Sequence, residues 1–125
     1  MYVRFVVGGD GEDHRRQTGV IAETRLLRDE GRLTDYENAW LDQIFAWFND
    51  NVPVPPYSSK DWPRDVAAWF KAKAATPAIS RIWDVIALLR EHGKHVRILR
   101  SKNPGIVYYE DKMQIVVSEF RTFFP

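Results

Sequence analysis

Apolar and polar residues alternate at the start of the chain, and similar short apolar stretches recur in its second half. Stretches of this length that are rich in β-branched and aromatic residues are typical of strands. The first ends at Gly8-Gly9, and the last two lie on either side of the polar Asp111. The pattern predicts five strands, over Tyr2–Val7, Val66–Lys73, His95–Arg100, Ile106–Glu110 and Met113–Phe120.

Between these strands, apolar residues recur at the spacing of a helix. A first helix is predicted from Thr18 to just before Gly31, a residue suited to the position after a helix C-terminus. A second begins at the capping box Thr34-Asp35-Tyr36-Glu37. In this motif the threonine hydroxyl accepts a hydrogen bond from the Glu37 amide, and the Glu37 carboxylate accepts one from the Thr34 amide.

A third helix is predicted between two of the strands. We expect Thr76 to be its N-cap, Pro77 its first helical residue and Gly93 the residue that ends it. Strand, helix and strand together have the length of a β-α-β crossover. Val66–Lys73 and His95–Arg100 are therefore predicted to run parallel, with a right-handed connection.

The predicted order of elements is β-α-α-β-α-β-β-β. It indicates an α/β fold at the border with α+β, in which three helices pack on a single mixed sheet of about five strands. A chain of 125 residues, 45% of them hydrophobic, suits one domain over residues 1–125 with a single core.

The segment "NDNVPVPPYSSKDWPR" contains four of the seven prolines and is not predicted to form regular structure. A loop of this length in a small domain is often functional or mobile. The interpretation that we favour is a polyproline strap packed over the core, with Tyr57 and Trp62 as its anchors, because aromatic side chains seldom lie free in water.

Composition excludes several classes of function. A net charge of +1 argues against a dedicated nucleic-acid-binding protein, whose affinity depends on a concentrated basic surface. The absence of cysteine rules out disulfides and thiolate zinc sites. The N-terminus does not resemble a signal peptide, and no apolar run approaches the ~20 residues that span a bilayer. We therefore expect a cytoplasmic protein with no membrane partner.

Short motifs in the second half of the chain carry a resemblance. They are Trp69-Phe70-Lys71, the helix-to-strand turn "LLREHGKHVRILRS", and Pro104-Gly105 leading into Val107-x-Tyr109-Glu110-Asp111-x-x-Gln114. With these motifs, the stretch from Trp69 to Phe120 resembles a family of small bacterial proteins with no assigned function. The resemblance implies an α/β fold and a bacterial cytoplasm, and it supplies no catalytic residue or ligand.

The densest chemistry in the sequence is the segment from Tyr108 to Lys112, "YYEDK". Glu110 and Lys112 have the spacing of the PD-(D/E)xK nucleases, in which two carboxylates hold Mg²⁺ and the lysine supports the attacking water. That chemistry also needs an acid on a neighbouring strand, and His95–Arg100 offers none. Polar residues between two apolar stretches are typical of a turn, so we interpret the segment as the tip of a hairpin.

Other candidate chemistry is incomplete. His14, His92 and His95 do not form a zinc-ligand set at recognisable spacing, and none has an evident partner for a hydrolytic triad. "GGDGED" follows a strand as a phosphate loop would, but it lacks the terminal Gly-Lys-Ser/Thr and carries three acids. We predict no cofactor, no metal ion and no catalytic residue.

Topology predicts one candidate ligand site. In parallel α/β units, ligands bind beyond the carboxyl ends of the strands, where the loops "KAKAATPAIS" and "RSKNPG" are expected to meet. A helix N-terminus and several cations there could hold phosphate, a carboxylate or a nucleic-acid backbone. The alternative, which we favour, is that the cations only solvate the edge of a loop. The residues of this predicted cationic edge are Lys73, Thr76, Ser80, Arg100, Ser101, Lys102 and Asn103.

Aromatic residues are abundant, and Phe120, Phe123 and Phe124 crowd the C-terminus. The last strand is predicted as a sheet edge that a partner could use. Two hypotheses of function remain. The first is a small binding or accessory protein that acts through contacts with another protein or with itself, as a homodimer. The second is an anion- or nucleotide-binding protein, or a small enzyme, that uses the cationic edge. Whether the protein is an enzyme stays open.

Overall fold

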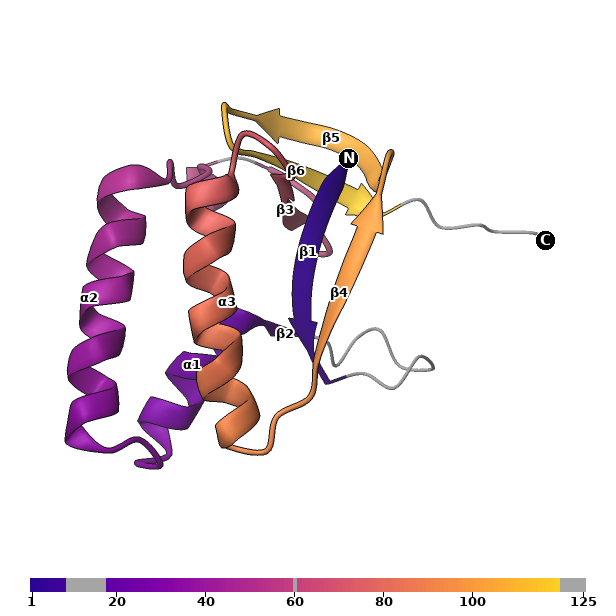
Figure 1. Cartoon of the computed structure of the whole chain (residues 1–125). Coiled ribbons are helices and arrows are strands. Elements are labelled where there is room, and N and C mark those ends of the chain that lie inside the picture. The colour runs from indigo at the N-terminus through magenta and orange to yellow at the C-terminus, as the bar shows by residue number, and fades with distance from the viewer. Residues whose placement is uncertain (9–17, 60, 120–125) are drawn as a thin grey trace.

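In the computed structural model, which describes residues 1–8, 18–59 and 61–119, helices and strands follow one another in the predicted order (Figure 1). A two-residue strand, β2, is added before the first helix. The elements are β1 Tyr2–Val7, β2 Thr18–Gly19, α1 Val20–Asp29, α2 Asp35–Asn51, β3 Ala67–Lys71, α3 Thr76–Glu91, β4 Val96–Ser101, β5 Gly105–Glu110 and β6 Gln114–Glu119. They form an α+β fold.

The sheet is antiparallel at every described pairing, so the prediction of a mixed sheet is wrong. From one edge to the other the long strands lie in the order β4, β1, β3, β6 and β5, and β2 pairs with the second half of β1. The strands β3 and β4 do run in the same direction, because both are antiparallel to β1. They are not neighbours, since β1 lies between them.

All three helices lie on one side of the sheet (Figure 1). Alternate residues of a strand point to opposite faces, and Val3, Phe5 and Val7 of β1 point to the helices. The main core forms there around the apolar stripe of α3 and buried leucines of α1 and α2. Its members include Leu27, Leu41, Ile82, Val85, Ile86 and Leu89.

A smaller apolar cluster lies outside the main core. Trp69 of β3 and Ile115 and Val117 of β6 are buried there, and Tyr2 and Leu99 pack against them. Trp69 pairs directly with Ile115 across the β3–β6 ladder, so neighbouring strands hold this cluster together.

Three helix ends follow the local sequence. The predicted capping box is confirmed: Thr34 Oγ1 accepts the Glu37 N–H at 3.1 Å, and Glu37 Oε1 accepts the Thr34 N–H at 2.9 Å. Gly31 and Gly93 follow α1 and α3 with φ of 69° and 77°, a conformation that glycine adopts without strain.

The start of α3 differs from the prediction. Thr76 is the first helical residue, and the N-cap is Ala75, which offers no side-chain cap. The chain already turns before this point, because the Ala75 N–H donates to the Lys71 carbonyl at 2.9 Å. The Thr76 hydroxyl therefore donates to the Lys73 carbonyl at 2.7 Å instead of accepting a helix amide.

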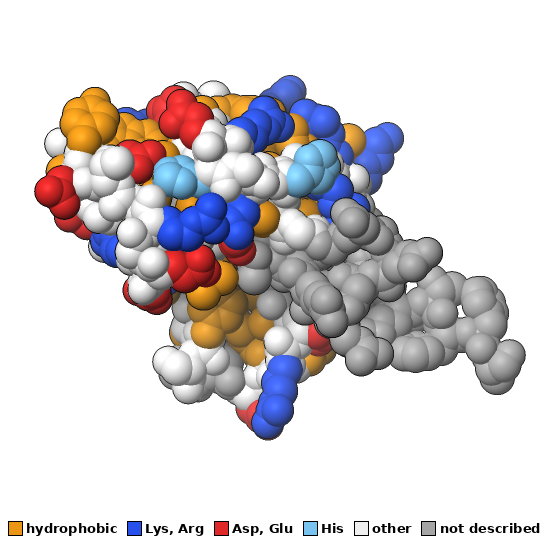
Figure 2. All heavy atoms as spheres, turned by 90° about the horizontal axis from the view of Figure 1, so that it is seen from below, with side chains coloured by type: hydrophobic (Ala, Val, Ile, Leu, Met, Phe, Trp, Pro, Cys, Tyr) orange, Lys and Arg blue, Asp and Glu red, His pale blue; other side chains and the backbone are white. Residues whose placement is uncertain are grey.

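A hydrogen bond joins two helix ends. His92, just after α3, places Nε2 2.9 Å from Oε2 of Glu37 in the first turn of α2. Hydrogen bonds from the Thr34 amide and from His92 hold the pKa of Glu37 below its usual value. Figure 2 looks at this end of the molecule, where acidic, basic and histidine side chains lie side by side.

The proline-rich segment packs against the β5–β6 hairpin, whereas the prediction placed it over the core. Tyr57 and Trp62 meet edge to face with ring centroids 5.9 Å apart, and Trp62 contacts Tyr109 at 6.2 Å. The Pro53 carbonyl accepts a hydrogen bond of 2.6 Å from Nε2 of the buried Gln114. Ring contacts and this bond hold the segment against the β5–β6 hairpin.

Candidate functional site

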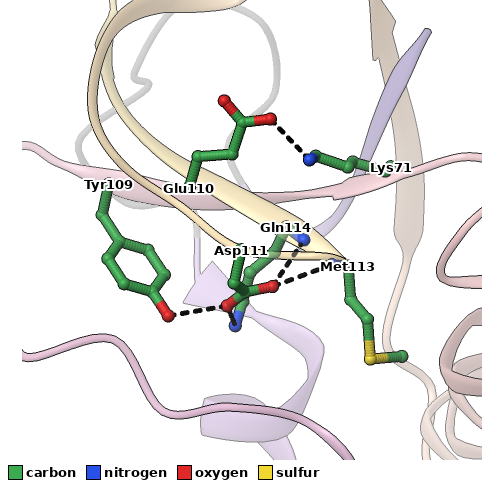
Figure 3. Close-up of polar contacts among 6 residues, drawn as sticks. All are labelled: Lys71, Tyr109, Glu110, Asp111, Met113 and Gln114. Atoms are coloured by element: carbon green, nitrogen blue, oxygen red, sulfur yellow. Dashed lines mark hydrogen bonds and ion pairs between the residues drawn. The ribbon is translucent and has the colours of Figure 1, made fainter.

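The "YYEDK" segment forms the tip of the β5–β6 hairpin, as predicted. Asp111 closes the turn: its N–H donates to the Gln114 carbonyl at 2.9 Å, and its Oδ1 accepts the amides of Met113 and Gln114 at 2.8 and 3.1 Å (Figure 3). The Tyr109 hydroxyl donates to Oδ2 at 2.8 Å, and Nε2 of Gln114 donates to the same oxygen at 3.0 Å.

These bonds determine the ionisation of the turn. Partial burial raises the pKa of Asp111, but the hydrogen bonds from Met113, Gln114 and Tyr109 outweigh it and leave the pKa below its usual value. The pKa of Tyr109 is raised, because its hydroxyl donates to that carboxylate. Asp111 is thus an ionised carboxylate whose oxygens are engaged in holding the turn.

Glu110 has a different role from its neighbour. Its carboxylate turns away from Asp111 toward β3, where Oε2 lies 2.5 Å from Nζ of Lys71 (Figure 3). The two acids of the motif therefore bind different partners and do not converge. In the part of the chain that the structure describes, no group of three His, Asp or Glu side chains could hold a metal ion.

The loops of the predicted cationic edge lie at the same end of the sheet. Tyr2, at the start of β1, pairs with Lys71 at the end of β3 and with Ser101 at the end of β4. The carboxyl ends of β3 and β4 therefore flank the first residues of β1. The predicted site is split by this strand, because β3 and β4 are not adjacent.

The exposed residues of this predicted edge are Lys73, Thr76, Ser80, Arg100, Lys102 and Asn103. Two of these residues form local hydrogen bonds. The Thr76 hydroxyl donates to the Lys73 carbonyl, and the Asn103 N–H donates to the Ser101 hydroxyl at 3.1 Å. The Thr76 N–H donates to the Lys73 carbonyl at 3.3 Å, and a proline follows it. The start of α3 thus has fewer free amides for an anion than the sequence suggests.

A shallow hollow of about 450 Å³ lies beside the end of β3. Of the predicted residues, Lys73 lines it and the other six do not. The contact between Lys71 and Glu110, which both line this hollow, was not predicted from the sequence. No local signal links them, because their contact depends on the pairing of β6 with both β3 and β5.

The exposed apolar edge is on a different strand from the one predicted. The last strand, β6, lies between β3 and β5, so the expectation that it forms an edge is wrong; Phe120, Phe123 and Phe124 lie outside the described residues. Among the described strands, β5 lies at this edge of the sheet, and it carries three consecutive exposed apolar side chains. Ile106 is 53% exposed, Val107 51% and Tyr108 39%.

Comparison of the chain with protein-family models, with curated proteins and with solved structures found no match. Among the described helices, none combines the length and the apolar character that crossing a bilayer requires.

Proposed function

We propose that this protein acts by binding, through the edge of its sheet, and that its first partner is a second copy of itself. The observation that carries the proposal is the run of exposed apolar side chains on β5, Ile106 to Tyr108. An edge strand also presents N–H and C=O groups that a further strand can pair with. Apolar side chains and an open ladder on one strand together favour association at this edge.

The opposite edge of the sheet differs in charge. There β4 pairs with β1 in the described residues and carries the exposed Arg100. Charged side chains on an edge strand discourage pairing with another strand. From Gly105 to Tyr109, β5 has no charged residue, so the two edges are not equally suited to a partner.

A second copy can pair with the N–H and C=O groups of the β5 edge through a symmetric contact. Two β5 strands that run antiparallel about a two-fold axis would each bury the same residues, which closes the assembly at a dimer. A β-bulge between Val107 and Tyr109 interrupts the ladder with β6. We therefore expect the pairing to centre on the segment before the bulge, from Gly105 to Val107.

Val107→Lys tests the proposal, because a charge on the edge should oppose pairing. Sedimentation velocity over a concentration series should detect a dimer in the wild type and at least a tenfold weaker association in the variant. The matched control is Tyr36→Lys, since Tyr36 is 81% exposed in α2, which belongs to the helix layer and not to the sheet; it should associate like the wild type. A wild type that stays monomeric throughout, or equal association of both variants, would refute the proposal.

A second candidate function is the binding of an anionic ligand at the cationic edge. Its support is that the ends of β3 and β4 lie at one end of the sheet, with Lys73, Arg100 and Lys102 exposed there. For either function the setting that we propose is the bacterial cytoplasm, on the strength of the sequence resemblance.

A further inference from the structure

The ladder on one side of β1 changes partner part-way along the strand. Tyr2 and Val3 pair with β3, whereas Val6 and Val7 pair with β2. Between these pairs, Arg4 and Phe5 have ladder partners on β4 but none on β2 or β3. The sheet therefore opens between β2 and β3, and a cavity of about 510 Å³ lies at this opening.

The interior of this cavity is mostly apolar. Its lining includes Phe5 and Ile82 of the main core, which are 5% and 1% exposed. Three further apolar side chains come from different elements, Val20 from α1, Phe48 from α2 and Phe70 from β3. Elements from both layers of the fold therefore form the cavity, and its volume is in the range of sites for small organic molecules, roughly 300–1,000 Å³.

Polar groups also line the cavity, and those that are charged have one sign. Arg4, Arg25 and Tyr57 are among the described lining residues, and no acid is among them. The Arg25 guanidinium lies 5.5 Å from the centroid of the Phe45 ring, so a contact with α2 restrains it. Burial raises the pKa of the Tyr57 hydroxyl, and the charge of Arg4 opposes this, which indicates that Arg4 lies near Tyr57.

We propose that this cavity binds a small organic carboxylate with an apolar body. The apolar body packs against Phe5, Phe48 and Phe70, where it leaves water. The carboxylate accepts hydrogen bonds from Arg25 and from the Tyr57 hydroxyl, and bonds to a guanidinium are stronger than those between neutral groups. An apolar molecule without the negative charge fits less well, because it offers no anionic acceptor to the Arg25 guanidinium.

Gly19 provides a way to close the cavity without straining the backbone. It lines the cavity, and a Cβ added there would meet no atom within 4 Å. Its φ of −67° and ψ of 156° are open to any residue. Leucine at this position should therefore occupy part of the space and leave the fold unchanged.

Decanoate and 1-decanol serve as probes, because they share a chain and differ in charge. Binding to the full chain is measured by calorimetry, and the site is located from amide chemical shifts. We expect decanoate to bind at least fivefold more tightly than decanol, with the largest shifts at Phe5, Val20 and Ile82. Arg25→Gln should weaken decanoate binding about fivefold, the range of an exposed ion pair. Arg90→Gln removes a charge outside the cavity and should bind like the wild type.

Gly19→Leu should bind decanoate at least tenfold more weakly than the wild type. Circular dichroism checks that this variant is folded, and Ala22→Leu, on another lining residue, replaces it if it is not. Absence of decanoate binding to the wild type, unchanged binding in the folded cavity variant, or shifts elsewhere would overturn the site. Equal affinity for decanol, or no effect of Arg25→Gln, would overturn the assignment of an anion.

Discussion

Replacing Thr34 by alanine tests the junction at which α2 begins. Thr34 Oγ1 accepts the Glu37 amide at 3.1 Å, and alanine removes this acceptor. Because Thr34 is exposed, water can reach the released amide, so the penalty is that of a lost cap and not of a buried unpaired group. Loss of a threonine N-cap costs about 1 kcal/mol of the free energy of unfolding.

A second contact limits the damage. Glu37 Oε2 lies 2.9 Å from His92, so the carboxylate stays attached to the end of α3 when the threonine hydroxyl is gone. The Thr34 backbone amide also remains, and it can still donate to Glu37 Oε1. We therefore expect the loss to stay near the value for the cap alone.

Urea unfolding followed by tryptophan fluorescence measures the effect. A change of about 1 kcal/mol lowers the midpoint by roughly 0.5 M urea. The melting temperature should fall by about 4 °C for a domain of this size. Thr34→Ser keeps the hydroxyl and should stay within a few tenths of a kcal/mol of the wild type.

Thr76→Ala is the informative comparison. Its hydroxyl donates to the Lys73 carbonyl and caps no helix amide, so its removal should cost less than half as much as Thr34→Ala. If Thr34→Ala leaves the midpoint unchanged, or if the two alanine variants are equally destabilised, the assignment of the cap is wrong.

Three further predictions concern charged groups. Glu37→Gln should be less stable than the wild type at pH 7, and urea unfolding at several pH values should show this difference shrinking as pH falls below 4.5. The reason is that the pKa of Glu37 is lowered in the folded state, so the stability that its carboxylate contributes is lost when it is protonated. Asp111→Ala should cost about 1–2 kcal/mol in urea unfolding because two turn amides lose their acceptor, whereas Lys112→Ala should change stability by less than about 0.5 kcal/mol. If phosphate or a nucleotide raises the melting temperature of the wild type, Arg100→Ala should reduce that rise more than Lys102→Ala, since a guanidinium can form two bonds to an oxyanion. An equal rise in all three proteins would contradict an anion site at the cationic edge.

The turns and helix ends of this protein are encoded by residues close together in the sequence. Thr34 and Glu37 are three positions apart and satisfy one another's amides, so the start of α2 was predictable. Gly93 adopts a positive φ just beyond the C-cap of α3, and Asp111 accepts hydrogen bonds from the amides of Met113 and Gln114, two and three positions later. In each case residue type selects a local hydrogen bond, whatever the rest of the chain does.

The arrangement of the strands was decided by the tertiary structure. The apolar stretches of β1, β3 and β6 are alike in length and composition, and their pattern does not state which pairs with which. Insertion of β1 between β3 and β4 split the predicted cationic edge, and the inner position of β6 moved the exposed edge to β5. The contact of Lys71 with Glu110 and the cavity beside Phe5 arise from the same pairings. Strand order depends on how apolar faces of distant segments fit against one helix layer, and this free energy belongs to the whole core and to no single stretch of sequence.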